Sequence, residues 1–319
     1  MNNHARLWAL AMFFHASFSH VNLAAAQDCA RCHAKEAARY ATSAHAHSLK
    51  KPGDSQFFRA LPPAPIGEAR GGFLLNYSLH DNLLRVQAVR GAESATGSIA
   101  WIFGAGHQAE TPVGVIGTTF FEHRVSYYAA NGRFGLTIGQ QGGISSSAES
   151  ALGRSLDREE VKRCFGCHAT GGLPEEPGFT PGVSCERCHP GAREHAEGKG
   201  SVSNPGRLSA RALVHFCAAC HRDRPEGDPD ASINIRYQAV RLMRSKCFQH
   251  GNLSCITCHD PHANVATDAA FYRERCLSCH QTVKNHQTEA RQRDCIECHM
   301  PRSAPLPHLA FTDHYIRVR

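Results

Sequence analysis

The sequence predicts an α-rich fold with little regular secondary structure and a small antiparallel β insertion, and three observations lead to this fold class. Cysteine pairs recur every 19 to 38 residues after residue 164, which leaves room only for short helices and loops between them. Strand-like patterns are confined to residues 66–142. Residues 231–246 are the best candidate for a longer helix.

The first 26 residues have the pattern of a secretory signal peptide. Arg6 provides a positive charge, Leu7–Phe18 is mostly apolar, and Ala24–Ala26 fits a cleavage site. An amphipathic first helix is the alternative. We expect a mature chain that starts near Gln27 and is exported, to the periplasm of a bacterium or beyond. No other apolar run approaches the ~20 residues that span a bilayer, so we expect no transmembrane anchor after cleavage.

Fourteen of the 15 cysteines fall into seven Cys-x-x-Cys-His units. This is the attachment pattern of haem c, because the spacing places two thiols and an imidazole on one face of a helical turn. Zinc sites and disulfides are the alternatives, but neither requires a histidine after every pair. We therefore expect seven covalent haems, a porphyrin-filled interior and iron ligation by each motif histidine. The units are Cys29-Cys32-His33, Cys164-Cys167-His168, Cys185-Cys188-His189, Cys217-Cys220-His221, Cys255-Cys258-His259, Cys276-Cys279-His280 and Cys295-Cys298-His299.

The chain divides into three parts after the signal peptide. Residues 27–65 form an N-terminal haem segment that ends in a proline-rich linker. Residues 66–142 form the antiparallel β insertion, and residues 143–319 carry the other six motifs. Within the insertion, Asn131-Gly132 predicts a type I′ hairpin turn. The strand candidates are Phe73–Ser78, Leu83–Val89, Ser98–Phe103, Phe120–Tyr128 and Arg133–Ile138.

The formal charge of +7 falls to +6 when Arg6 leaves with the signal peptide, since 34 basic and 28 acidic residues remain. Each oxidised haem with two ionised propionates and two neutral histidines adds about −1. The loaded protein is then near neutral, and we expect no nucleic-acid binding despite the basic polypeptide.

Several segments resemble known multihaem proteins. Cys29–His33 with Tyr40–His45, and Val183–His189 with His195, are similar to segments of the cytochrome c-552/c-554 family. The C-terminal half resembles doubled-CXXCH domains in three segments: Leu253–His262, Cys295–Pro301 and His308–His314. The resemblance implies a multihaem cytochrome c with stacked haems.

The second axial ligand of each iron decides between electron transfer and catalysis. The resemblance assigns this position to His45, His195, His262, His286, His308 and His314. His107 is the seventh candidate, because Gly104 and Gly106 allow close approach of the backbone. His47 competes with His45, and we expect His80 and His123 at the surface of the β insertion.

Electron transfer through closely spaced, mostly bis-histidine haems is the expected function. Redox proteins and the cytochrome c maturation machinery are the expected partners. The alternative is an oxidoreductase with one open haem, acting on a small nitrogen or sulfur compound such as nitrite or hydroxylamine. A haem module fixed inside a larger assembly is a third hypothesis. Cys247 is interpreted as a buried thiol or as a neighbour of the haem at Cys255-Cys258.

Overall fold

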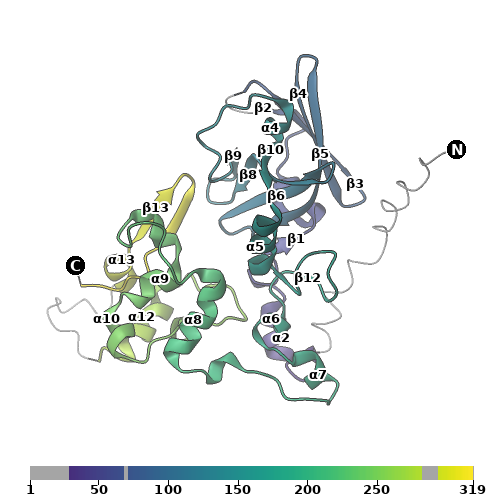
Figure 1. The fold of residues 1–319 in the computed structure, drawn as a ribbon. Helices are drawn as coiled ribbons and strands as arrows, with labels where there is room; N and C mark the ends of the chain where they lie inside the picture. The colour runs from purple at the N-terminus through teal and green to yellow at the C-terminus, as the bar shows by residue number, and fades with distance from the viewer. Residues whose placement is uncertain (1–28, 68–70, 282–293, 319) are drawn as a thin grey trace.

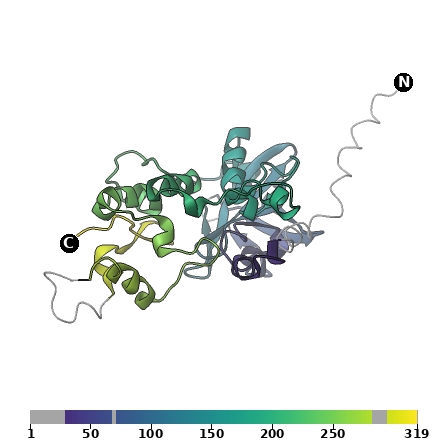
Figure 2. The ribbon, with the colours of Figure 1, turned by 90° about the horizontal axis from the view of Figure 1, so that it is seen from below.

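The computed structural model describes residues 29–67, 71–281 and 294–318. The expected signal peptide and His286 lie outside these residues. A β-rich region and a helical region lie side by side in two perpendicular views (Figures 1 and 2). Within the described residues, no helix is both long and apolar enough to cross a membrane.

The β-rich region is built on one antiparallel sheet, which holds ten strands among the described residues. Its main path runs in the order β10-β7-β6-β5-β4-β3-β2, with β1 paired to β5 and β8 joining β6 to β9. The strands are β1 (Leu49–Lys50), β2 (Ile66–Gly67), β3 (Leu74–His80), β4 (Leu83–Arg90), β5 (Glu93–Phe103), β6 (Ala109–Ile116), β7 (Thr119–His123), β8 (Val125–Tyr128), β9 (Arg133–Leu136) and β10 (Gly153–Leu156).

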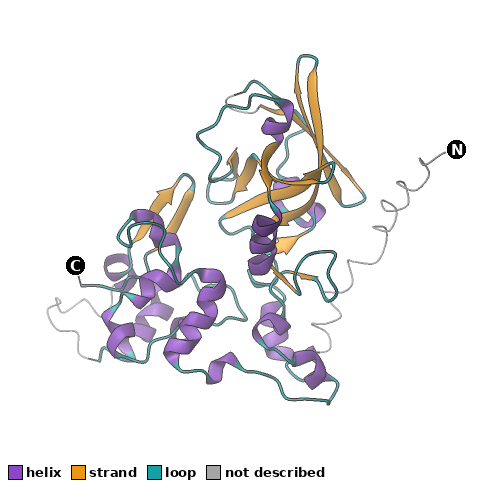
Figure 3. Cartoon of the chain, in the orientation of Figure 1, coloured by secondary structure: helices purple, strands orange, loops and turns teal. Residues whose placement is uncertain are grey.

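This sheet corrects the predicted fold class. The chain is not α-rich with a small insertion, because the sheet forms a large antiparallel half-barrel. It also extends beyond the expected insertion on both sides: β1 pairs with β5, and β10 pairs with β7. Figure 3 shows that strands form much of the β-rich region. Very short strands whose partners are distant in the sequence show no clear alternation of apolar and polar residues, so the sequence did not predict them.

Local sequence still explains most of the hairpins. Leu84, Val86 and Ala88 alternate with exposed residues along β4 and fill the inner face of the sheet. Asp81 and Asn82 adopt positive φ angles of 49° and 60°, as a tight two-residue turn between β3 and β4 requires.

The second hairpin differs from its prediction. The register pairs Tyr128 with Arg133, which leaves a four-residue loop between β8 and β9. Only Gly132 in that loop has a positive φ, so the turn is not type I′. The single strand expected over residues 120–128 is interrupted at Arg124, between β7 and β8.

Two apolar clusters lie against the sheet. The first packs α4 (Ala148–Leu152) and Phe57 against the inner strands. The second joins Trp101 and Phe103 on β5 to Val161 and Phe165 on α5 (Arg158–His168). The second cluster anchors the helix that carries the second cysteine motif.

The helical region consists of short helices, as expected from the motif spacing. The predicted helix over residues 231–246 is divided into η3 (Ser232–Arg236) and α9 (Gln238–Met243), and α10 (Lys246–His250) follows them. The remaining helices are α2 (Ala34–Tyr40), η1 (Pro52–Asp54), α3 (Gln56–Arg59), α6 (Cys185–Cys188), α7 (Ala192–Ala196), η2 (Pro205–Arg207), α8 (Ala210–His221), α11 (Cys255–Cys258), α12 (Ala269–Leu277) and α13 (Cys295–His299). Two small hairpins complete the fold, β11 (Ala169–Thr170) with β12 (Thr180–Pro181), and β13 (Arg302–Leu306) with β14 (Leu309–Thr312).

Candidate haem-binding site

Each cysteine motif spans about one helical turn, either alone or at the end of a longer helix such as α5 or α8. The backbone N–H of His189 donates to Cys185 O at 2.8 Å, and His259 N donates to Cys255 O at 3.0 Å. The same bond joins His33 to Cys29 and His280 to Cys276. One such turn brings two thiols and an imidazole to one side of the chain.

All seven motifs contribute to the lining of one connected cavity of about 4290 Å³. Sites for single small ligands measure about 300–1,000 Å³, so this space suits several large groups rather than one. His259 Nδ1, on its wall, is buried without a hydrogen-bond partner among the described residues. The fifteen cysteines, all within the described residues, form no disulfide. The cavity and its donor set therefore fit covalently attached haems.

Three pairs of histidine rings face one another across this cavity at nearly the same distance. Ring centroids are 6.2 Å apart for His45–His221, 6.1 Å for His189–His262 and 6.2 Å for His259–His314. Two imidazoles bound to one metal ion through nitrogens about 2.0–2.1 Å from it have ring centroids roughly 6 Å apart. The His189 and His262 rings are within 8° of parallel, yet they are too far apart for face-to-face stacking, which needs carbon contacts of about 3.5–4.0 Å.

Hydrogen bonds fix which ring nitrogen of these histidines carries the proton. His45 Nδ1 lies 3.1 Å from Pro261 O, His189 Nδ1 lies 3.0 Å from Ser203 O, and His314 Nδ1 lies 3.0 Å from Thr312 O. Because a carbonyl oxygen only accepts, each Nδ1 must carry the hydrogen. Nε2 then keeps its lone pair for a metal ion, which is the usual arrangement of a ligating histidine.

Comparison with known proteins agrees with this chemistry. A family model described as cytochrome c554 and c-prime matches residues 138–190. Over 172 residues the chain is 26% identical to the dissimilatory sulfite reductase MccA of Wolinella succinogenes, a match that covers 39% of the chain and 22% of that protein. The chain thus corresponds to less than a quarter of the length of this relative.

A solved structure shares the fold. The outer cell wall cytochrome OcwA superimposes with a TM-score of 0.51, covering 92% of the present chain and 79% of OcwA at 14% identity. The motifs, the family match and this fold point to the same class of protein. The chain is a multihaem c-type cytochrome.

The thiols of different motifs lie close together in this cytochrome. Interacting thiols link Cys29 with Cys185, Cys167 with Cys220, Cys217 with Cys255, and Cys276 with Cys295. Cys188 lies near Cys217 and Cys220, and Cys258 lies near Cys279. Cys247, the fifteenth cysteine, lies beside Cys258 and Cys279, and burial raises the pKa of its thiol. Each of the seven motifs therefore has a cysteine that interacts electrostatically with a cysteine of another motif.

Burial favours the neutral imidazole at four histidines of the cavity wall, and the neutral form is the one that metal ligation requires. It lowers the pKa of His314 to about 4, and it also lowers the pKa of His168, His221 and His259. His168 Nδ1 lies 2.9 Å from Ser48 O, and His299 Nδ1 lies 2.8 Å from Arg317 O. These backbone acceptors carry no sequence signal, since any residue supplies a carbonyl.

The other candidate histidines lie elsewhere. His195 on α7 lines the cavity, but within the described residues its ring contacts no motif histidine. His308 packs against Tyr128 with centroids 4.9 Å apart, and its Nδ1 lies 3.1 Å from Asn131 Nδ2, beside the sheet. His107 is exposed and is not part of the cavity wall.

His123 differs from its expected surface position. Its side chain is fully buried, and its two nitrogens lie 2.5 Å from Leu152 O and 2.7 Å from Tyr77 Oη. Both ring nitrogens are used within the sheet core, which leaves none for a metal ion.

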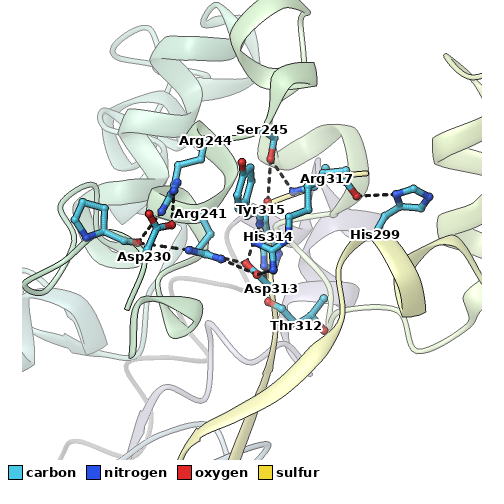
Figure 4. A network of polar contacts seen from close by, with 12 residues as sticks. Asp230, Arg241, Arg244, Ser245, His299, Thr312, Asp313, His314, Tyr315 and Arg317 are labelled. Atoms are coloured by element: carbon cyan, nitrogen blue, oxygen red, sulfur yellow. Dashed lines mark hydrogen bonds and ion pairs between the residues drawn. The ribbon is translucent and has the colours of Figure 1, made fainter. Parts of the chain in front are cut away.

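The C-terminal residues of the cytochrome form a polar network over α9 (Figure 4). Asp313 accepts two hydrogen bonds from Arg241, and the distal candidate His314 follows it directly. Nothing in the sequence indicated this ion pair, because its partners are 72 residues apart.

Proposed function

We propose that this cytochrome carries seven haems c, is exported, and transfers electrons along a chain of closely packed haems. The observation that carries the proposal is the set of three histidine ring pairs, each spaced for one iron and each with at least one Nδ1 hydrogen-bonded away from the metal. When bound, the haems supply the redox chemistry, since each iron takes up and releases one electron.

The ring pairs support an assignment of distal ligands across the fold. His45 from the N-terminal segment would complete the iron of His221, and His262 would complete the iron of His189. His314 from the C-terminal end would complete the iron of His259. Two imidazoles on one iron would leave no position for a substrate and would favour a low-spin electron carrier.

The electrostatic interactions between thiols of different motifs support an order for the electron path. They connect the motifs of His33, His189, His221, His259, His280 and His299 in one line. The motif of His168 joins this line as a side branch at His221, through Cys167 and Cys220. Redox partners would then dock near the ends of the line, at the first and the last motif.

Intact mass and electron paramagnetic resonance test this proposal on the matured protein. We expect the mass of residues 27–319 plus seven haems, and low-spin signals for the irons that have two histidines. A mass with fewer haems, or high-spin signals for most irons, would contradict it. A mature start other than residue 27 would contradict the predicted cleavage site alone.

One observation favours a second candidate function, an oxidoreductase with an open haem. The enclosed ring of His168 contacts Phe103 and Ser48 O, and no second imidazole among the described residues contacts it. Of the other motif histidines outside the three ring pairs, His33 and His280 are exposed, and the half-buried His299 has its Nδ1 2.8 Å from Arg317 O. Lys51 on the same cavity wall lies 3.7 Å from the centroid of the Trp101 ring and provides positive charge for a small anion.

Anion titration tests the second function. The similar reductase is named for sulfite, so sulfite and nitrite are the first anions to add to the oxidised protein. If the haem at His168 is open, a high-spin signal of one haem should shift on addition, and Lys51→Gln should weaken that shift. A spectrum that does not change with either anion favours pure electron transfer.

A further inference from the structure

Asp313 is a buried carboxylate directly beside a candidate iron ligand. Its side chain is 2% exposed and the Arg241 side chain is 4% exposed. Arg241 Nε and Nη2 donate to the two carboxylate oxygens at 2.8 and 2.7 Å, a bidentate pair (Figure 4). Such a buried pair fixes geometry more than it adds stability, because both charges lose their hydration.

The pair anchors a short segment, the C-terminal strap (residues 313–317). Tyr315 N donates to Asp313 Oδ1 at 3.0 Å, so the carboxylate also holds the backbone just past His314. Ser245 Oγ donates to His314 O, and Ile316 N donates to Ser245 Oγ. The backbone is therefore held on both sides of the His314 side chain.

The strap touches the axial histidines of two motifs. His314 lies across from His259, with ring centroids 6.2 Å apart. Four residues past Asp313, the Arg317 carbonyl accepts from His299 Nδ1 at 2.8 Å, while Arg317 Nη2 lies 3.4 Å from Asp313 Oδ2. A shift of the strap would thus move one ligand and release the hydrogen bond that orients another.

We propose that Asp313 is a positioning residue that locks the strap, so that His314 reaches the iron of His259 and Arg317 O orients His299. This inference rests on the proposed bis-histidine ligation. Asp313 touches neither imidazole in a hydrogen bond; it acts through Arg241 and the strap backbone.

A neighbouring ion pair provides a matched control. Asp230 pairs with Arg244 in the same arginine cluster, but its side chain is 72% exposed and it makes no bond to the strap backbone. Asp230→Asn removes a carboxylate from the cluster without releasing the strap. Asp313→Asn keeps the size of the side chain but leaves the Arg241 guanidinium without its counter-charge.

The experiment compares Asp313→Asn, Asp230→Asn and His314→Ala in the fully matured protein by electron paramagnetic resonance and by carbon monoxide binding after reduction. We expect Asp313→Asn to convert up to one haem equivalent to high spin and to bind up to one additional equivalent of carbon monoxide. Asp230→Asn should match the wild type. If Asp313→Asn also matches the wild type, the positioning role is overturned.

His314→Ala separates this inference from the ligand assignment. If His314→Ala shows no high-spin haem, His314 is not the second ligand of the iron at His259. If His314→Ala shows a high-spin haem but Asp313→Asn does not, the ligand assignment stands and only the positioning role of Asp313 is contradicted. If the Asp313→Asn variant does not mature, the Arg241→Lys variant tests the positioning role instead. Arg241→Lys retains the buried positive charge but loses the bidentate hydrogen bonds to Asp313. A partial high-spin signal in Arg241→Lys supports the role, and a wild-type spectrum overturns it.

Discussion

At the residue scale, the proton on the imidazole ring separates candidate ligands from other histidines. His45 and His47 are two residues apart, and spacing alone left them in competition. His45 Nδ1 bonds a carbonyl and leaves Nε2 for a metal, whereas His47 Nε2 lies 2.9 Å from Ala41 O and must carry the proton itself. The hydrogen bonds therefore favour the proposed assignment of His45 over His47, because most ligating histidines bind through Nε2 in this arrangement.

A pair of substitutions tests that selection. His45→Ala should convert one haem equivalent from low to high spin, because the iron of His221 loses its second imidazole. His47→Ala should leave the spin state unchanged. Electron paramagnetic resonance of the two oxidised variants makes the comparison, and the reverse result would transfer the ligand role to His47.

His123 gives the stability of the β-rich region a pH dependence. Burial lowers its pKa from 6.5 to about 4, while the hydrogen bond to Leu152 O offsets part of that effect. Between pH 6.5 and 4 the unfolded chain binds a proton that the folded chain excludes, so stability falls as the pH is lowered through this window. At pH 4 this proton binding lowers the free energy of unfolding by about 3 kcal/mol relative to neutral pH.

Denaturant unfolding of the wild type and of His123→Gln at several pH values measures this contribution. The free-energy gap between them should shrink between pH 6.5 and pH 4, because glutamine does not titrate and the wild type loses stability. A constant gap would mean that His123 accepts a proton in the folded state.

At the element scale, the sequence predicted local motifs correctly but did not predict how distant strands assemble into the sheet. The seven cysteine units and the hairpin between β3 and β4 follow from residue type and spacing alone. The half-barrel does not, because β1 has two residues, β10 has four, and both pair with strands that are distant in the sequence. His123 was assigned to the surface by residue type, although the alternation with Phe121 along β7 places it inside.

The start of β10 depends on a glycine. Gly153 has a φ of 151°, and a Cβ there would lie 2.0 Å from Glu122 O on β7. Gly153→Ala should destabilise the region by about 1–3 kcal/mol, because the strand must shift or the backbone must strain. Gly142→Ala is the control, since an added Cβ meets no atom within 4 Å there.

Thermal unfolding followed by circular dichroism compares the two glycine variants with the wild type. The midpoint should fall for Gly153→Ala and remain near the wild-type value for Gly142→Ala. Equal midpoints would indicate that β10 is not held against β7 as the register describes.

At the scale of the whole molecule, the bound haems change the charge that the polypeptide presents. The sequence alone has an isoelectric point near 8.7, and the chain without its first 26 residues keeps a net +6. Seven oxidised haems with ionised propionates would offset this charge at about −1 each. A near-neutral surface is what a carrier needs if it meets several redox partners without binding any of them tightly.

Isoelectric focusing of the matured protein beside the haem-free polypeptide tests this balance. We expect the loaded form to focus at least about one pH unit below the haem-free form, because the propionates are acidic and the axial histidines no longer take up protons. Chain length and composition are the same in both samples, so the shift reports the haem groups alone. A loaded protein that focuses as high as the haem-free chain would show that the cavity holds far fewer porphyrins than its seven motifs allow.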